Sequence, residues 1–256
     1  MYDYRYNIYR NTGIFREPGV FACLLAIGSL FELAKNEKCN VKKIIVFVAC
    51  ILTTFSTAGF IIGAVILLYL LLFALKISSS KKIIILLLAF CGFLVLFNTQ
   101  RELVESVLLN KFMASNNTYG SWFARYQSIF GNLSIALKNP LFGIGRYSLY
   151  EITLATQGNY EAIDNTNTLL INFSAFGILY GTIMFVGSFL FFSKHDLGLL
   201  KSISLFLILF IALSNEDLGQ NIIYFFSAFV GLLPRTIYSN KYPIYETRQY
   251  YAIKNS

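Results

Sequence analysis

Long apolar runs separated by short polar connectors make up most of the chain. The apolar residues are continuous within each run rather than alternating with polar ones, which indicates helices. A helix needs roughly 20 such residues to cross a bilayer. We expect spans near residues 20–33, 41–55, 58–75, 83–97, 167–192, 197–213 and 218–233. The pattern therefore predicts an all-α integral membrane protein with about seven transmembrane helices.

A longer and more polar segment, residues 98–164, separates the fourth predicted span from the fifth. Within it, apolar residues recur at the spacing of one helical face. They are Trp122, Tyr126, Ile129, Phe130, Leu133 and Leu137. Beside them Arg125, Ser128 and Asn132 form a polar row, and Asn139-Pro140 ends the pattern. We expect an amphipathic helix that lies on the membrane or over the mouth of the bundle.

Composition supports a single membrane domain over residues 1–256. Apolar residues make up 56% of the chain and charged residues 13%, and the mean hydropathy is +0.61. Soluble domains carry roughly 25% charged residues, so this much apolar surface requires an apolar solvent. The four cysteines form no C-x-x-C pair and His195 is the one histidine. We therefore expect neither a metal nor a cofactor.

Charges in the connectors predict the orientation. Alternate connectors are rich in lysine, and they contain Lys35, Lys38, Lys42, Lys43, Lys76, Lys81, Lys82, Lys194 and Lys201. The turn at Ser56 and Thr57 has no charge, and residues 215–217 are acidic. By the positive-inside rule, the lysine-rich connectors are cytoplasmic and the 98–164 segment faces outward. The net charge of +8 then reflects topology rather than affinity for nucleic acid.

The amino-terminal residues conflict with this orientation. Residues 1–17 fall outside although they contain Arg5, Arg10 and Arg16. One explanation is that this chain is the carboxy-terminal part of a longer protein, and the alternative is an amino terminus that is naturally outside.

The predicted outer face collects most of the candidate chemistry. It holds Arg10, Arg16, Glu17, Ser56, Arg125, Arg146, Asp164, Asn165, Asn167, Glu216 and Asp217. The planar arginine fork binds phosphate oxygens bidentately and keeps its charge. Several arginines at a membrane-level cavity would hold a lipid-linked diphosphate without a metal, whereas solvated loop charges are the alternative interpretation.

Other glycine and acidic patterns exclude several function classes. Gly59-x-x-x-Gly63 and Gly177-x-x-x-Gly181 have the small-residue spacing of close helix packing. Gly143-x-Gly145 lacks the third glycine of a dinucleotide site. The chain contains neither a phosphate-binding G-x-x-x-x-G-K-[ST] loop nor a D-x-D pair. An ATP-driven pump and a metal-dependent transferase that uses nucleotide sugars are therefore not expected.

Four segments of the chain occur in a recognisable order. They are residues 10–19, the serine turn 54–59, Arg125 followed by the 139–145 turn, and Thr166-Asn167 followed by Gly177. In this order they resemble the bacterial O-antigen polymerase and O-antigen ligase family of membrane glycosyltransferases. Thr166 stands where the ligase signature has histidine, and Thr57 stands where the serine turn often carries arginine. Both departures favour a polymerase over a ligase.

The resemblance implies a metal-independent transfer that lengthens a glycan on a polyprenyl diphosphate carrier. Among the outer residues we expect Glu17 as general base, with Arg125 and Arg146 stabilising the departing diphosphate. The residues expected to bind substrate are Arg10, Arg16, Ser56 and Asn167. Expected partners are the carrier-linked glycan, the lipid bilayer and other polysaccharide assembly proteins. The location is then the bacterial cytoplasmic membrane, with the active face outward.

Two alternatives remain at this stage. An O-antigen ligase would move a finished glycan to a lipid acceptor. A transporter would carry ionisable groups inside its spans and often an internal repeat. The predicted spans contain almost no ionisable residues and no repeat, which favours chemistry at a surface.

Overall fold

The structure is a computed structural model, and it describes most of the chain. The described residues are 2–3, 8–15, 17–35, 39–75, 77–99, 121–156, 166–195, 197–215, 217–218 and 222–233. The residues singled out above that lie outside this part are Arg5, Arg16, Lys38, Lys76, Asp164, Asn165 and Glu216.

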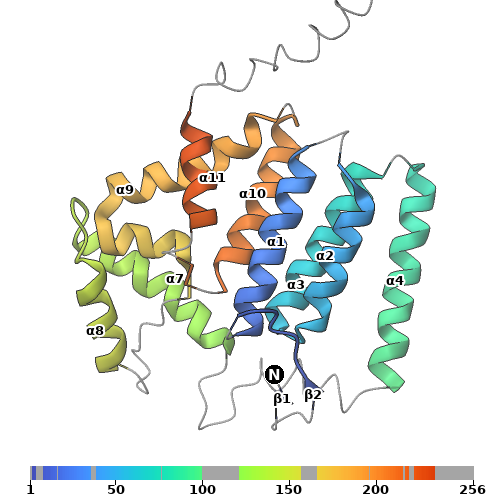
Figure 1. The fold of residues 1–256 in the computed structure, drawn as a ribbon, viewed down its shortest axis with the longest axis horizontal. Coiled ribbons are helices and arrows are strands. Elements are labelled where there is room, and N and C mark those ends of the chain that lie inside the picture. The colour runs from blue at the N-terminus through green and yellow to red at the C-terminus, as the bar shows by residue number, and fades with distance from the viewer. Residues whose placement is uncertain are drawn as a thin grey trace, which may run out of the picture.

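The described residues are mostly helical, which confirms the all-α class (Figure 1). The helices are α1 Pro18–Ala34, α2 Val41–Thr53, α3 Thr57–Tyr69, α4 Ser79–Thr99, α7 Ser121–Lys138, α8 Arg146–Thr156, α9 Thr168–Ser193, α10 Leu199–Leu213 and α11 Ile222–Leu232. A π-helical turn, η2 Leu70–Ala74, extends α3. Two short antiparallel strands, β1 Tyr2–Asp3 and β2 Ile8–Tyr9, pair near the amino terminus. Helix α8 is an element that the sequence analysis did not predict.

Local signals explain where several helices begin. Pro18 occupies the first turn of α1, where its missing N–H costs nothing. The Asn40 side chain caps α2 by accepting from the backbone N–H of Lys43 at 3.3 Å. Asn167 caps α9 in the same way through the N–H of Leu170 at 3.0 Å.

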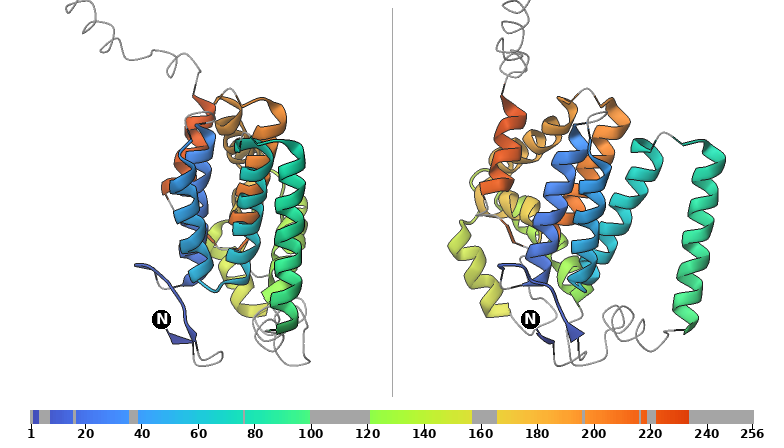
Figure 2. Two further views of the ribbon diagram at one scale, coloured as in Figure 1. Left: turned by 90° about the vertical axis from the view of Figure 1, so that its right-hand side faces the viewer. Right: turned by 45° about the vertical axis from the view of Figure 1, so that its right-hand side comes forward.

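Helices α1, α2, α3 and α10, together with residues of α9 and α11, form the main apolar core (Figures 1 and 2). Helix α1 packs against the other three, and α11 packs along α9. The chain alternates between the two ends of the bundle (Figure 1). The connectors that follow α1, η2 and α9 lie at one end. The α2–α3 turn and helix α7 lie toward the other.

The number of predicted spans is not supported. A helix occupies each of the seven predicted positions, but in the described part only α9 is both long and apolar enough to cross a membrane. Shorter apolar helices cover Pro18–Ala34, Ala58–Ala74 and Leu199–Leu213. The described helices therefore establish the class of fold, and not seven membrane crossings.

Helix α9 is itself broken at Gly177. This residue has φ 87° and ψ 173°, a conformation open in practice only to glycine. We call this point the Gly177 break. The expectation that Gly177 and Gly181 form a helix-packing pair is wrong for Gly177, because its neighbour is the backbone of Leu141 in a loop. The close helix crossing lies instead between Gly187 of α9 and Gly231 of α11.

The predicted helix over residues 121–138 is confirmed as α7. Residues of its polar row are buried, and residues of its apolar stripe are exposed. Ser128 and Asn132 of the polar row are fully buried, at 0% exposure. In contrast, Phe130, Leu133 and Leu137 of the apolar stripe are exposed at 53%, 46% and 68%. Helix α7 therefore packs on α9 through Ser128 and Asn132 together with Ile135, while three residues of the apolar stripe face outward.

Candidate functional site

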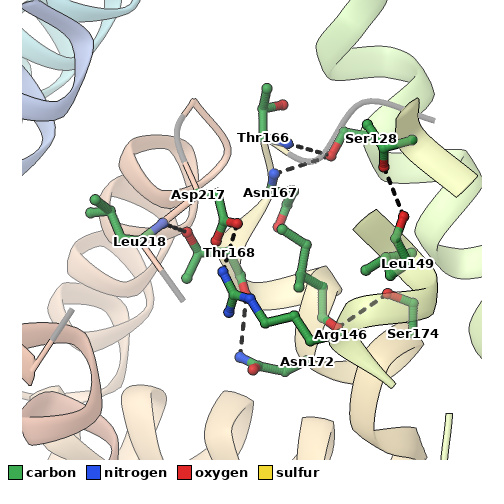
Figure 3. A network of polar contacts seen from close by, with 12 residues as sticks. Ser128, Arg146, Leu149, Thr166, Asn167, Thr168, Asn172, Ser174, Asp217 and Leu218 are labelled. Carbon is green, nitrogen blue, oxygen red and sulfur yellow. Dashed lines mark hydrogen bonds and ion pairs between the residues drawn. The ribbon is translucent and has the colours of Figure 1, made fainter. Parts of the chain in front are cut away.

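Polar residues from four parts of the chain meet at the amino end of α9 (Figure 3). The Ser128 hydroxyl of α7 accepts hydrogen bonds from the backbone N–H groups of Thr166 and Asn167, at 3.1 and 3.0 Å. The Asn167 amide donates to the Ser214 hydroxyl at 2.9 Å. Ser128 and Asn167 are fully buried, so these bonds fix the start of α9 against α7 and the end of α10.

The polar row of α7 continues this network one turn further along. Asn132 donates to the backbone carbonyl of Ser128 at 2.7 Å. Its side-chain oxygen accepts from the Ser174 hydroxyl of α9 at 2.5 Å. All three residues are fully buried. Hydrogen bonds between polar side chains therefore hold two helices together where apolar packing is usual.

An ion pair crosses the same region (Figure 3). Arg146, the first residue of α8, donates to the Asp217 carboxylate at 2.7 Å. The two side chains are 30% and 33% exposed, so the pair borders the surface. Each partner is next to an anchored residue. The N–H of Gly145 donates to Ala175 at 2.9 Å, and the N–H of Leu218 donates to the Thr168 hydroxyl at 2.8 Å.

A second buried contact joins α9 to α11. The Asn172 amide donates to the Tyr224 hydroxyl at 2.7 Å and to the carbonyl of Thr168 at 3.1 Å. Asn172 and Tyr224 are each 1% exposed. The first half of α9 thus carries polar residues that bond to α7, to α11 and to the α10–α11 connector.

The amino-terminal segment docks on the α2–α3 turn. Arg10 donates through its Nε to the carbonyl of Thr54 at 3.2 Å. Asn11 bonds to Thr53 twice, once through backbone atoms at 3.1 Å and once between side chains at 3.0 Å. Ser56 lies in this turn and is 7% exposed. Two segments of the family resemblance, residues 10–19 and 54–59, are therefore in direct contact.

The candidate residues divide into two groups. Arg125 is half-buried on α7, one turn before Ser128, and Arg146 begins α8, so both lie around the amino end of α9. Arg10 and Ser56 meet at the α2–α3 turn, and Glu17 is exposed directly before α1.

The side chain of Asn167 already uses both of its polar atoms in hydrogen bonds within the fold. Its side-chain oxygen caps α9 and its amide nitrogen bonds to Ser214. Its role in substrate binding stays a prediction, and within the fold it is a helix cap.

Sequence reasoning missed several participants. It placed Asp217 on the outer face without pairing it to Arg146, and it passed over Ser174, Asn172 and Tyr224 as ordinary span residues. An asparagine and a serine within one apolar run were the available signal, because such residues need buried partners.

Arg125 and Arg146 supply positive charge around the amino end of α9, and the helix dipole adds to it, while the Asp217 carboxylate offsets the charge of Arg146. Among the described residues, no cluster of three or more histidine, cysteine, aspartate or glutamate side chains has the arrangement of a metal site.

No protein-family model, no curated protein and no solved structure matches this chain.

Proposed function

We propose first that the chain is a multi-pass membrane protein. Helix α4 supports this, because residues 83–88 are all exposed, at 40% or more, although they cover every face of the helix. Isoleucine and leucine exposed on all sides are unfavourable in water and favourable in lipid. Helix α7 adds independent support, because its polar residues Ser128 and Asn132 are buried. Its apolar residues Phe130, Leu133 and Leu137 are exposed.

The shorter helices are compatible with this environment. Helix α1 has 17 residues and α10 has 15. At 1.5 Å per residue they span roughly 22–26 Å, a few ångströms less than a typical hydrocarbon core. Local thinning of the bilayer accommodates a mismatch of that size at modest cost. The break in α9 is also compatible, because irregular backbone at membrane depth is tolerated where it is buried in protein.

Within that class, we propose that the protein polymerises polyprenyl-diphosphate-linked oligosaccharide repeats into a surface polysaccharide. The observation that carries the proposal is the pairing of the segments that resemble the polymerase and ligase family. Residues 10–11 bond to residues 53–54, and the 139–145 turn bonds to α9 beside Gly177. Within each pair the segments are far apart in sequence and bond to each other in the fold.

The proposed chemistry uses charge rather than a metal. The hydroxyl of one repeat attacks the anomeric carbon of another, and the bond to the carrier diphosphate breaks. Arg125 and Arg146 stabilise the negative charge that develops on the departing diphosphate. Asp217 engages one nitrogen of Arg146, and a guanidinium has five N–H donors, so further donors remain for phosphate oxygens. Glu17 accepts the proton of the attacking hydroxyl, and Arg10 and Arg16 contribute to binding of the substrate.

Deletion of the gene, followed by sizing of the lipid-linked glycans, tests this function. Loss of a polymerase leaves carrier-linked glycans that are one repeat long. Long chains stranded on the carrier would show a ligase instead. Unchanged glycans would contradict both enzymatic assignments.

Complementation with point variants then tests the two arginines. Arg125→Ala and Arg146→Ala are each expected to reduce elongation on the order of a hundredfold, since removal of one preorganised donor to a developing charge has that effect. Lysine at either position should restore activity only in part, because it lacks the bidentate fork. Lys138→Ala is the matched control, because Lys138 is an exposed cation at the end of α7. Normal chain length in both arginine variants would remove them from the site.

A further inference from the structure

The 139–145 turn fills the gap in the hydrogen bonding of α9 at the Gly177 break. Where the helix is interrupted, the carbonyls of Ser174 and Ala175 accept from the N–H groups of Ile144 and Gly145, at 3.0 and 2.9 Å. On the far side of the break, the N–H of Ile178 donates to the carbonyl of Pro140 at 2.7 Å. We call this contact between the turn and the break the joint.

Two glycines make the joint possible. A Cβ at Gly143, where φ is +63°, would lie 2.5–2.6 Å from backbone atoms of Ser174 and Ala175. A Cβ at Gly177 would collide with the backbone of Leu141. Because the colliding atoms are backbone on both sides, no side-chain rotation relieves them. Each glycine is therefore required for the approach of the two chains as well as for its own conformation.

Apolar packing supports the joint on one side. Ile144 packs against a small buried cluster formed by Ile135 of α7, Leu149 of α8, and Ile171 and Ala175 of α9. The turn, α7, α8 and the first half of α9 thus share one core. Arg146 follows directly after Gly145, at the point where the chain passes from the turn into α8.

We propose that Gly143 and Gly177 are positioning residues for the transfer reaction, acting through Arg146. The joint fixes the start of α8 on α9, and Leu218 fixes Asp217 on Thr168, so the guanidinium is held from both sides. This inference rests on the proposed function for its catalytic consequence, and its structural part is independent of it. A displacement of about 1 Å in such a group lowers a reaction rate by roughly a hundredfold.

The chain offers a matched control for the strain of a non-glycine residue. Gly198, before α10, has φ +77° and no atom within 4 Å of a new Cβ. Gly198→Ala therefore imposes the backbone cost of a non-glycine residue at positive φ without a collision, and it does so away from the joint. Gly145 has φ +79° and is also open. Gly145→Asn should keep the joint because asparagine tolerates positive φ, whereas Gly145→Val should open it.

The experiment measures both geometry and reaction. In the full chain without its native cysteines, spin labels at Tyr150 of α8 and Leu179 of α9 report the distance across the joint, and both positions are exposed. We expect a narrow distance distribution in the parent and in Gly198→Ala, and a broad one in Gly143→Ala and Gly145→Val. The kcat of elongation, normalised to folded protein, should fall roughly a hundredfold in Gly143→Ala and Gly145→Val. Gly145→Asn should stay close to the parent.

Each outcome decides the inference. A narrow distribution in both Gly143→Ala and Gly145→Val would overturn the joint as the element that holds α8. A broad distribution with unchanged elongation would overturn its role in positioning Arg146. If the parent shows no elongation, the proposed function fails, and the distance distributions still decide whether the joint holds α8. If Gly143→Ala does not fold, the asparagine and valine variants at Gly145 carry the same comparison.

Discussion

Replacing Ser128 by alanine is expected to destabilise the protein far more than the loss of one hydroxyl suggests. The Ser128 oxygen accepts from two backbone N–H groups, those of Thr166 and Asn167, at 3.1 and 3.0 Å. Ser128 and Asn167 are fully buried. Alanine would leave both donors without this acceptor at the point where α9 begins.

The magnitude follows from the two donors. An unsatisfied buried polar group costs about 1–3 kcal/mol, and the Thr166 donor is only part-buried, so the two donors together cost roughly 2–5 kcal/mol in the free energy of unfolding. The remaining contact of the Ser128 hydroxyl, with the Asn132 amide at 3.4 Å, is long and adds little. For a chain of this size, that loss corresponds to a fall of roughly 5–20 °C in the unfolding midpoint.

Thermal unfolding of purified protein in detergent measures the effect. Ser134→Ala is the matched control, because Ser134 is exposed on the same helix, and its midpoint should equal that of the parent. If Ser128→Ala and Ser134→Ala unfold at the same temperature, the buried network does not hold α9 and the reasoning is refuted.

Three further predictions concern topology and contacts at the site. An impermeant thiol reagent in intact cells should label a cysteine at Ser134 and not one at Lys81, and the reverse pattern would invert the proposed orientation. Tyr224→Phe removes the acceptor of the buried Asn172 amide and should lower the free energy of unfolding by about 1–3 kcal/mol, and an unchanged value would count against that bond. Asp217→Asn should cost at most about 1 kcal/mol of stability, because a pair one-third exposed is screened by solvent. A larger loss in the same unfolding assay would show a structural ion pair.

The helices were predictable from the sequence because their signal is local. Continuous apolar runs mark α1, α2, α3, α4, α9, α10 and α11, and the spacing of apolar residues marks α7. Helix α8 gives a weaker signal, since Arg146–Thr156 mixes tyrosine, serine and threonine with few aliphatic residues. The number of membrane crossings was not predictable in the same way, because it depends on helix length and breaks as well as on apolar runs.

The Gly177 break could not be predicted because its cause is not local. A glycine within an apolar run is typical of helix packing, and only the backbone of Leu141 explains the positive φ. The ion pair between Arg146 and Asp217 is equally non-local, as the partners are 71 residues apart. In contrast, the contact between Arg10 and the α2–α3 turn agrees with the expectation from connector order that both belong to one face.

The most direct test of the proposed function uses the purified chain in lipid vesicles. The substrate is the carrier-linked glycan that accumulates when the gene is deleted, so its sugars and linkage are those of the host. We predict that the chain converts single repeats into a ladder of longer carrier-linked glycans without added metal, and that Arg146→Ala does so roughly a hundredfold more slowly. Folded protein that leaves every carrier-linked repeat one unit long would contradict the account.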